Sequence, residues 1–81
     1  MEEKLTYIIT EENYIKGRYP EIVFVTDSKR KALKCLRENY NFNDDDIAHI
    51  EEWGDVAWVG ETLSNIRLIG VPKNKFTKVK F

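Results

Sequence analysis

The segment that most constrains this 81-residue chain is 27–40, DSKRKALKCLRENY, which has the pattern of an amphipathic helix. Asp27 and Ser28 both suit an N-cap, because a short side-chain oxygen can accept a hydrogen bond from an otherwise unpaired N–H of the first turn. The apolar side chains behind them recur at helical spacing and form one stripe, with Cys35 on its border. The stripe consists of Ala32, Leu33, Leu36 and Tyr40. We therefore predict a helix over 28–40 that packs against the rest of the chain.

The charges of this helix go against the usual preference. Lys29, Arg30 and Lys31 occupy its first turn, where the helix dipole disfavours each positive charge by ~0.3–1 kcal/mol. Either these exposed side chains are simply tolerated, or an acidic surface, internal or foreign, compensates them. Arg30, Lys34 and Arg37 follow one another at i, i+4 and i+7, so they form a basic ridge beside the apolar stripe.

The other apolar segments have the character of strands, which predicts an α+β fold with a mostly antiparallel sheet of four or five strands and the helix across one face. Residues 5–10 alternate between two faces, as β-branched and aromatic residues do in a strand. The continuous run Ile22-Val23-Phe24-Val25 predicts a central strand covered on both faces. The predicted strands are 5–10, 21–26, 56–62, 65–71 and, as a lysine-rich edge strand, 76–80.

Two segments allow alternatives. Residues 11–20 are predicted to be a polar loop, whose tyrosines either fold back on the sheet or are presented to a partner. Residues 44–53 are predicted to be a second, short helix with Asn43 as N-cap, three aspartates in its first turn and Gly54 after its end. Phe42 and Ile47 have the spacing of a hydrophobic staple. A strand over 47–53 is the alternative.

The composition indicates one small domain, 1–81, and excludes several functions. Charged residues make up 33 % of the chain but leave a net charge of −1, so the overall charge selects no partner. One cysteine and one histidine cannot form a disulfide or a usual zinc site, and no nucleophile–base constellation or glycine-rich phosphate loop can be assembled. We therefore expect no enzyme, no metal and no cofactor. The lack of a membrane span or signal peptide predicts a cytoplasmic protein.

The order of the charges is more informative than their sum. Residues 27–40 carry five basic and two acidic side chains, whereas 41–64 carry no lysine or arginine and seven acidic side chains. Such blocks either neutralise each other across the fold or form an exposed acidic docking patch. The candidate patch is Asp44, Asp45, Asp46, Glu51, Glu52 and Asp55. Its sign would suit a partner that normally holds nucleic acid.

Aromatic residues give the candidate anchors of a protein interface, since tyrosine and tryptophan are enriched there. The candidates are Tyr14, Tyr19, Trp53 and Trp58, although two tryptophans in so small a domain are more often part of its core. The basic ridge and the lysine-rich C-terminal strand, with Phe76 and Phe81, provide the alternative of nucleic-acid binding. A structural or assembly protein is the third hypothesis.

The segments YIIT, IVFVTDSKRKALKCL and HIEEW follow one another in an order that resembles small uncharacterised proteins of bacteriophages and mobile elements of Gram-positive bacteria. The resemblance covers residues 5–53 as a strand, a loop, a second strand and a helix. It implies a phage origin and a non-enzymatic, protein-binding role as a modulator or inhibitor of a host protein, including host-defence components. It assigns no catalytic residue.

Overall fold

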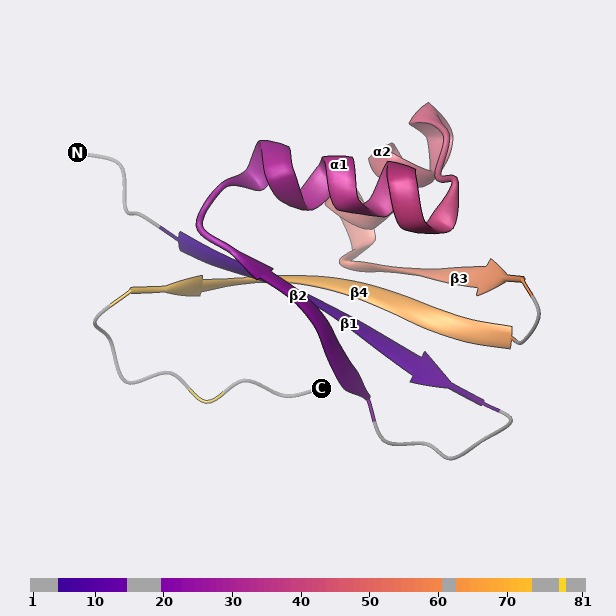
Figure 1. The fold of residues 1–81 in the computed structure, drawn as a ribbon, viewed down its shortest axis with the longest axis horizontal. Helices are drawn as coiled ribbons and strands as arrows, with labels where there is room; N and C mark the ends of the chain where they lie inside the picture. The colour runs from indigo at the N-terminus through magenta and orange to yellow at the C-terminus, as the bar shows by residue number, and fades with distance from the viewer. Residues whose placement is uncertain (1–4, 15–19, 61–62, 74–77, 79–81) are drawn as a thin grey trace.

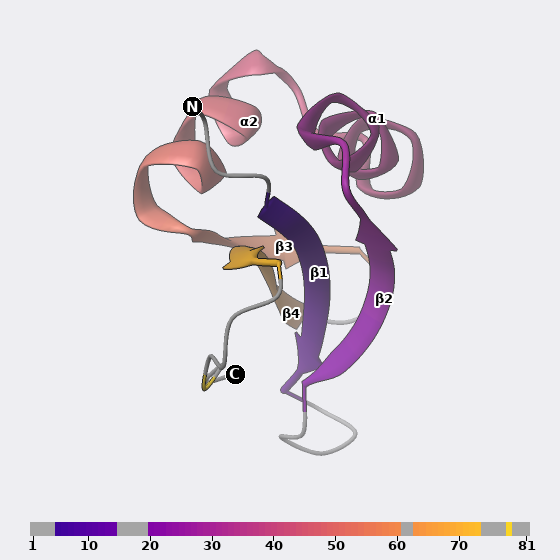
Figure 2. The same cartoon turned by 90° about the vertical axis from the view of Figure 1, so that its left-hand side faces the viewer.

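The structure is a computed structural model that describes residues 5–14, 20–60, 63–73 and 78. It confirms the α+β fold: within these residues, one four-stranded antiparallel sheet carries two helices on the same face (Figures 1 and 2). The strand order is β2-β1-β4-β3, so that β1 and β4 are central. The elements are β1 (Leu5–Asn13), β2 (Glu21–Thr26), α1 (Lys29–Tyr40), α2 (Asp44–Trp53), β3 (Asp55–Val59) and β4 (Leu63–Pro72).

Helix α1 forms as the sequence predicts. Ser28 is its N-cap, and its side-chain oxygen accepts a hydrogen bond from the backbone N–H of Lys31 at 3.3 Å. Asn41 ends the helix in the left-handed conformation, with φ 56°, which asparagine tolerates better than most residues. The apolar stripe lies against the sheet: three of its members are buried and Leu33 is half-buried against them.

Helix α2 also forms, which excludes a strand over 47–53. The side chain of Asn43 accepts from the backbone N–H of Asp46, and the Asp46 carboxylate accepts from the backbone N–H of Asn43, so the two make a capping box. Gly54 ends the helix with φ 82°, a backbone conformation that few residues other than glycine adopt without strain. The predicted staple residues Phe42 and Ile47 are both buried in the core.

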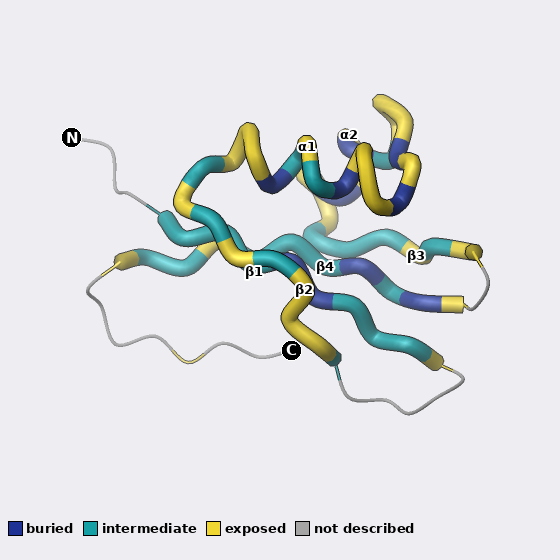
Figure 3. The backbone as a smooth tube through the Cα atoms, viewed as in Figure 1, coloured by how far each residue is buried: buried dark blue, intermediate teal, exposed yellow. Residues whose placement is uncertain are grey.

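The core lies between the helices and the sheet (Figure 3). Each layer contributes residues, and burying these side chains supplies the main free energy that opposes the loss of chain entropy. The buried cluster consists of Ile9, Ala32, Leu36, Tyr40, Phe42, Ile47, Ile50 and Ile66.

Strand β2 corrects the sequence-based prediction, because among the described strands it lies at the edge of the sheet and not at its centre. A β-bulge explains why its sequence misleads. Phe24 pairs with Ile9, but Ile22 pairs with the next residue of β1, Thr10, so Val23 is an extra residue. The bulge turns Ile22 to the same sheet face as Val25, away from the helices, and the two side chains are 55 % and 54 % exposed. The apolar run thus reflects a bulge and not burial on both faces.

Three smaller predictions either differ from the structure or lie outside the described residues. β1 continues to Asn13, so residues 11–13 belong to a strand and not to the predicted loop over 11–20, of which 15–19 lie outside the described residues. Trp53, which could have belonged to the core, is instead exposed at the end of α2. The predicted fifth strand, 76–80, lies outside the described residues except for Lys78, as do the last two residues of the predicted strand 56–62.

Leu36 is the central buried residue of α1, with no exposed surface. We expect Leu36→Ala to lower the free energy of unfolding by ~2–5 kcal/mol, because it removes buried methyl groups and leaves a cavity. A domain of this length has a total stability of roughly 4–12 kcal/mol, so a urea melt would show the change plainly. Leu33→Ala is the matched control at a half-buried position and should cost clearly less; equal losses would contradict this packing.

Candidate functional site

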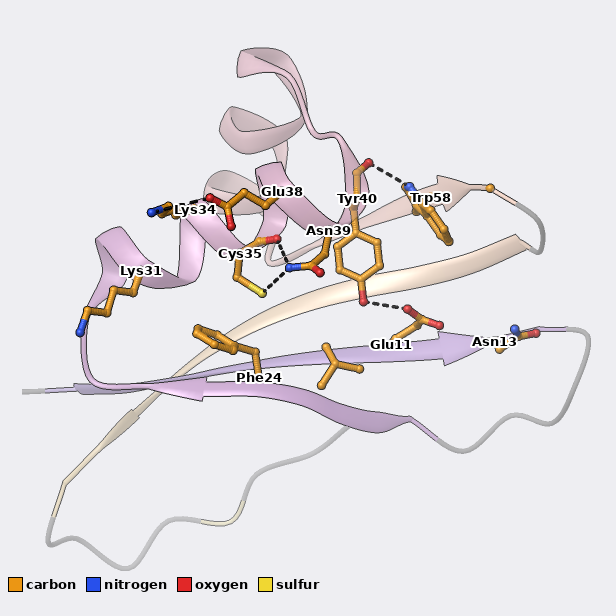
Figure 4. A pocket seen from close by; sticks show the side chains of 12 residues that line it. Glu11, Asn13, Phe24, Lys31, Lys34, Cys35, Glu38, Asn39, Tyr40 and Trp58 are labelled. Carbon is orange, nitrogen blue, oxygen red and sulfur yellow. Dashed lines mark hydrogen bonds and ion pairs between the residues drawn. The ribbon is translucent and has the colours of Figure 1, made fainter.

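A groove of about 1120 Å³ lies between α1 and the sheet (Figure 4). It forms because only Asp27 and Ser28 join β2 to α1, so the helix must turn back along the strand that precedes it. We call it the α1–β2 groove. Its helix wall consists of Lys31, Lys34, Cys35, Glu38 and Asn39, and its sheet side of Glu11, Asn13, Val23 and Phe24.

Tyr40, Trp58 and Gly60 line the other end of the groove. The Tyr40 hydroxyl donates a hydrogen bond to Oε1 of Glu11 at 2.7 Å, and Nε1 of Trp58 donates to the backbone oxygen of Tyr40 at 3.0 Å. The two rings meet edge to face, with centroids 5.1 Å apart. Gly60 lies beside the Trp58 ring so closely that a Cβ at this position would collide with it. These contacts fix the shape of this end of the groove.

Charge is unevenly distributed along the groove. Lys31 and Lys34 lie near the start of α1, whereas Glu11 and Glu38 lie toward its end (Figure 4). Lys34 pairs with Glu38 at 3.7 Å, a loose and exposed contact. Within the described residues Lys31 makes no ion pair, although its charge helps to lower the pKa of Asp27, for which the hydrogen bond from Lys73 is the main cause.

Cys35, the one cysteine of the chain, places a thiol in the helix wall of the groove. Burial raises the pKa of its thiol, and Asn39 Nδ2 donates to its sulfur at 3.4 Å. A raised pKa keeps the thiol protonated at neutral pH, which is the opposite of an activated cysteine. His49, the one histidine, is exposed on α2 with its ring 6.4 Å from that of Trp53.

Four of the six carboxylates of the predicted acidic patch make contacts with other residues of the same chain. Asp44 accepts from Arg37 at 2.7 Å, and Glu51 lies 3.2 Å from Lys29. Asp46 caps α2, and Asp55 lies 3.4 Å from Arg67. Only Asp45 and Glu52, of the six, have no ion pair or side-chain hydrogen bond within the part of the chain that the structure describes.

The basic ridge is exposed on α1, but two of its three residues are engaged. Arg37 pairs with Asp44 and Lys34 with Glu38, which leaves Arg30 without an ion pair among the described residues. Lys29, in the first turn, is compensated by Glu51 of α2. The acidic block thus neutralises part of the basic helix within the fold.

The candidate aromatic anchors differ in how far they are exposed. Trp58 packs against the core beside Tyr40 and lines one end of the α1–β2 groove. Trp53 is 68 % exposed at the end of α2, and Tyr14 is also exposed. Tyr19 lies outside the described residues. Trp53 and Tyr14 therefore remain as candidate anchors on the surface.

Sequence reasoning missed the groove itself. Its lining comes from β1, β2, α1 and the end of β3, and no local sequence motif predicts that these four elements lie next to one another. Cys35 at the border of the helical stripe was one available signal, since a border residue of an amphipathic helix lines the margin of its contact. The uninterrupted apolar run that precedes the helix was another.

Comparison of the chain with protein-family models, with curated proteins and with solved structures finds no match. Among residues 5–14, 20–60, 63–73 and 78, no three histidine, cysteine or carboxylate side chains gather as a metal site would require. No helix in the same residues is long and apolar enough to cross a membrane.

The ionisation of Tyr40 at high pH provides a test of the contacts that this residue makes. Burial, and then the hydrogen bond to Glu11, raises the pKa of Tyr40 above its ordinary value. A raised folded-state pKa contributes stability that is complete below the unfolded pKa of ~10 and is lost as pH rises above it, since only the unfolded chain then ionises. We expect the free energy of unfolding to fall between pH 9.5 and 11 as a result.

Tyr40→Phe removes the ionising group, so its stability should fall less steeply over the same pH range than that of the wild type. At pH 7 it should cost about 0.5–3 kcal/mol for the lost hydrogen bond to a carboxylate. Urea melts at several pH values measure both effects. Parallel pH profiles for the two proteins would contradict the buried hydroxyl.

Ser64 gives a second, independent test of the core next to the groove. It pairs with Asn13 on one side and Trp58 on the other, and its hydroxyl is buried with no hydrogen-bond partner among the described residues. An unsatisfied buried polar group costs ~1–3 kcal/mol. Ser64→Ala should therefore leave the melting midpoint unchanged or raise it, and a clear loss of stability would show that the hydroxyl has a partner in solution.

Proposed function

We propose that this protein is a non-enzymatic protein-binding module and that the outward face of α2 binds the partner. The observation that carries the proposal is the 68 % exposure of Trp53. A tryptophan has the largest apolar surface of any side chain, and leaving it in water costs free energy that burial in a partner's pocket recovers. Tryptophan is also among the residues most enriched at binding hot spots.

The charges around Trp53 indicate the kind of partner. Asp45, His49, Glu52 and Trp53 follow one another at i, i+4, i+7 and i+8, so they share one side of α2. Asp45 and Glu52 are the two carboxylates of the acidic block that make no contact within the described chain, whereas the other four are engaged. An anchor flanked by two available carboxylates fits a basic protein surface, such as one that normally holds nucleic acid.

The resemblance to phage and mobile-element proteins supplies a further expectation, that the partner is a host protein and the module its modulator. The phage or mobile-element origin of the chain stays a prediction. Nucleic-acid binding is the weaker alternative, because Lys34 and Arg37 of the basic ridge are already engaged with carboxylates of the same fold.

The proposal is tested by affinity capture from a Gram-positive host lysate. The wild-type protein should retain a host protein that Trp53→Ala loses, and the purified pair should bind with an affinity that falls about tenfold or more in the variant. Asp45→Lys and Glu52→Lys should slow association, as loss of charge at the rim of an interface does, and raised salt should reduce the difference from wild type.

Tyr14→Ala is the matched control, because it removes an exposed aromatic side chain from another part of the surface. All variants change exposed residues and should retain the wild-type urea melt within ~0.5 kcal/mol. Retention of the same proteins by Trp53→Ala and by wild type would refute binding through this face. Loss of binding in Tyr14→Ala alone would indicate that the interface includes Tyr14 and not Trp53.

A further inference from the structure

We propose that the α1–β2 groove binds an extended segment of a partner polypeptide, which adds to the sheet alongside β2 and places an acidic residue near Lys31. This is a second surface, separate from the α2 face around Trp53. The proposal goes beyond a protein-binding role for α2, and its test does not depend on that role.

The first observation is the open edge of β2. No described strand pairs with its outer side, since β2 is the first strand of the order β2-β1-β4-β3. In an edge strand every second residue directs its backbone N–H and C=O groups outward, and these groups can pair with an added strand. Edge strands usually carry lysine, proline or inward-pointing charges that prevent such pairing, but residues 22–25 are all apolar.

The second observation is the position of the groove. It borders β2, with Val23 and Phe24 on one side and Cys35 on the other, so it lies where side chains of an added strand would enter (Figure 4). The bulge brings two consecutive residues of β2, Val23 and Phe24, to the lining of the same groove. A helix beside an open sheet edge is the arrangement in which some peptide-binding domains add a strand and read alternate side chains.

The dimensions suit a short segment. The groove follows α1 from Lys31 to Tyr40, ten residues separated by nine steps of ~1.5 Å each, or ~14 Å in all. An extended chain advances ~3.3 Å per residue, so about four residues of a partner would follow the groove. Two of these would direct side chains into it.

The third observation is charge, which decides between occupants. Residues 27–40 carry five basic and two acidic side chains, and neither Arg30 nor Lys31 makes an ion pair within the described chain. A second copy paired through β2 would bring the same basic helix beside α1, and the two helices would repel each other. An acidic residue in a foreign segment gains from the same charges. The occupant is therefore a foreign, extended segment in which apolar residues alternate and one end is acidic.

The test uses a display library of random octapeptides selected on the full chain. The enriched peptides should share alternating apolar residues with an acidic residue at one end. One of them, labelled with fluorescein, then reports affinity by fluorescence anisotropy. Hydrogen exchange by NMR should show slower exchange of outward-facing amides in β2 when the peptide is bound, because they gain partners.

Two neighbouring residues of α1 give a matched pair of variants. Lys31 lines the groove and Arg30 does not, while both lie in the first turn and change charge equally on substitution. Lys31→Glu should weaken peptide binding about tenfold, whereas Arg30→Glu should change it less than about threefold. Val23→Lys should also abolish most of the binding, with Val59→Lys, at a 78 % exposed valine of the other edge strand, as its control.

The outcomes separate this surface from the α2 face. Trp53→Ala should bind the peptide as wild type does, so failure of either proposal leaves the other standing. Three results would each overturn the proposal. The selected peptides could share no pattern, Lys31→Glu and Arg30→Glu could weaken binding equally, or the β2 amides could exchange at the same rate with and without the peptide. A concentration-dependent dimer by analytical ultracentrifugation that Val23→Lys dissociates would replace the foreign segment with a second copy.

Discussion

Tyr40 is the residue on which the arrangement of the elements most depends. As the last residue of α1, it holds together three parts of the chain that are distant in sequence. Its hydroxyl reaches Glu11 of β1, its carbonyl accepts from Trp58 of β3, and its ring contacts both Trp58 and Phe42. The end of the helix is thereby fixed above the sheet, and the turn into α2 starts from a defined place. Both candidate binding surfaces follow from that position, since one lies under α1 and the other on α2.

The sequence predicts those parts of the fold that depend on local chemistry. The N-cap at Ser28, the buried stripe of α1 and the capping box of α2 each arise from residues within a few positions of one another. Local signals fail at β2, because its place in the sheet is decided by which strands lie beside it. A bulge then hides the alternation that would have revealed an exposed face.

The candidate sites show the same limit. The sequence separates an acidic block from a basic helix, but it cannot tell which carboxylates find a partner. That depends on the turn between the helices, which brings Asp44 to Arg37 and Glu51 to Lys29 but leaves Asp45 and Glu52 without an ion pair among the described residues. The groove depends still more on tertiary structure, because Glu11, Phe24 and Cys35 meet only once the helix has folded back over the sheet.

The extra residue in β2 shows how this surface could be altered without changing the rest of the sheet. Ile22 and Phe24 already occupy the positions opposite Thr10 and Ile9 that a regular ladder would give them if they were adjacent. A chain without Val23 would therefore keep every other pairing of this hairpin. Val23 is thus an extra residue that the sheet accommodates by a local bend, and its loss would alter the lining of the groove while leaving the other pairings in place.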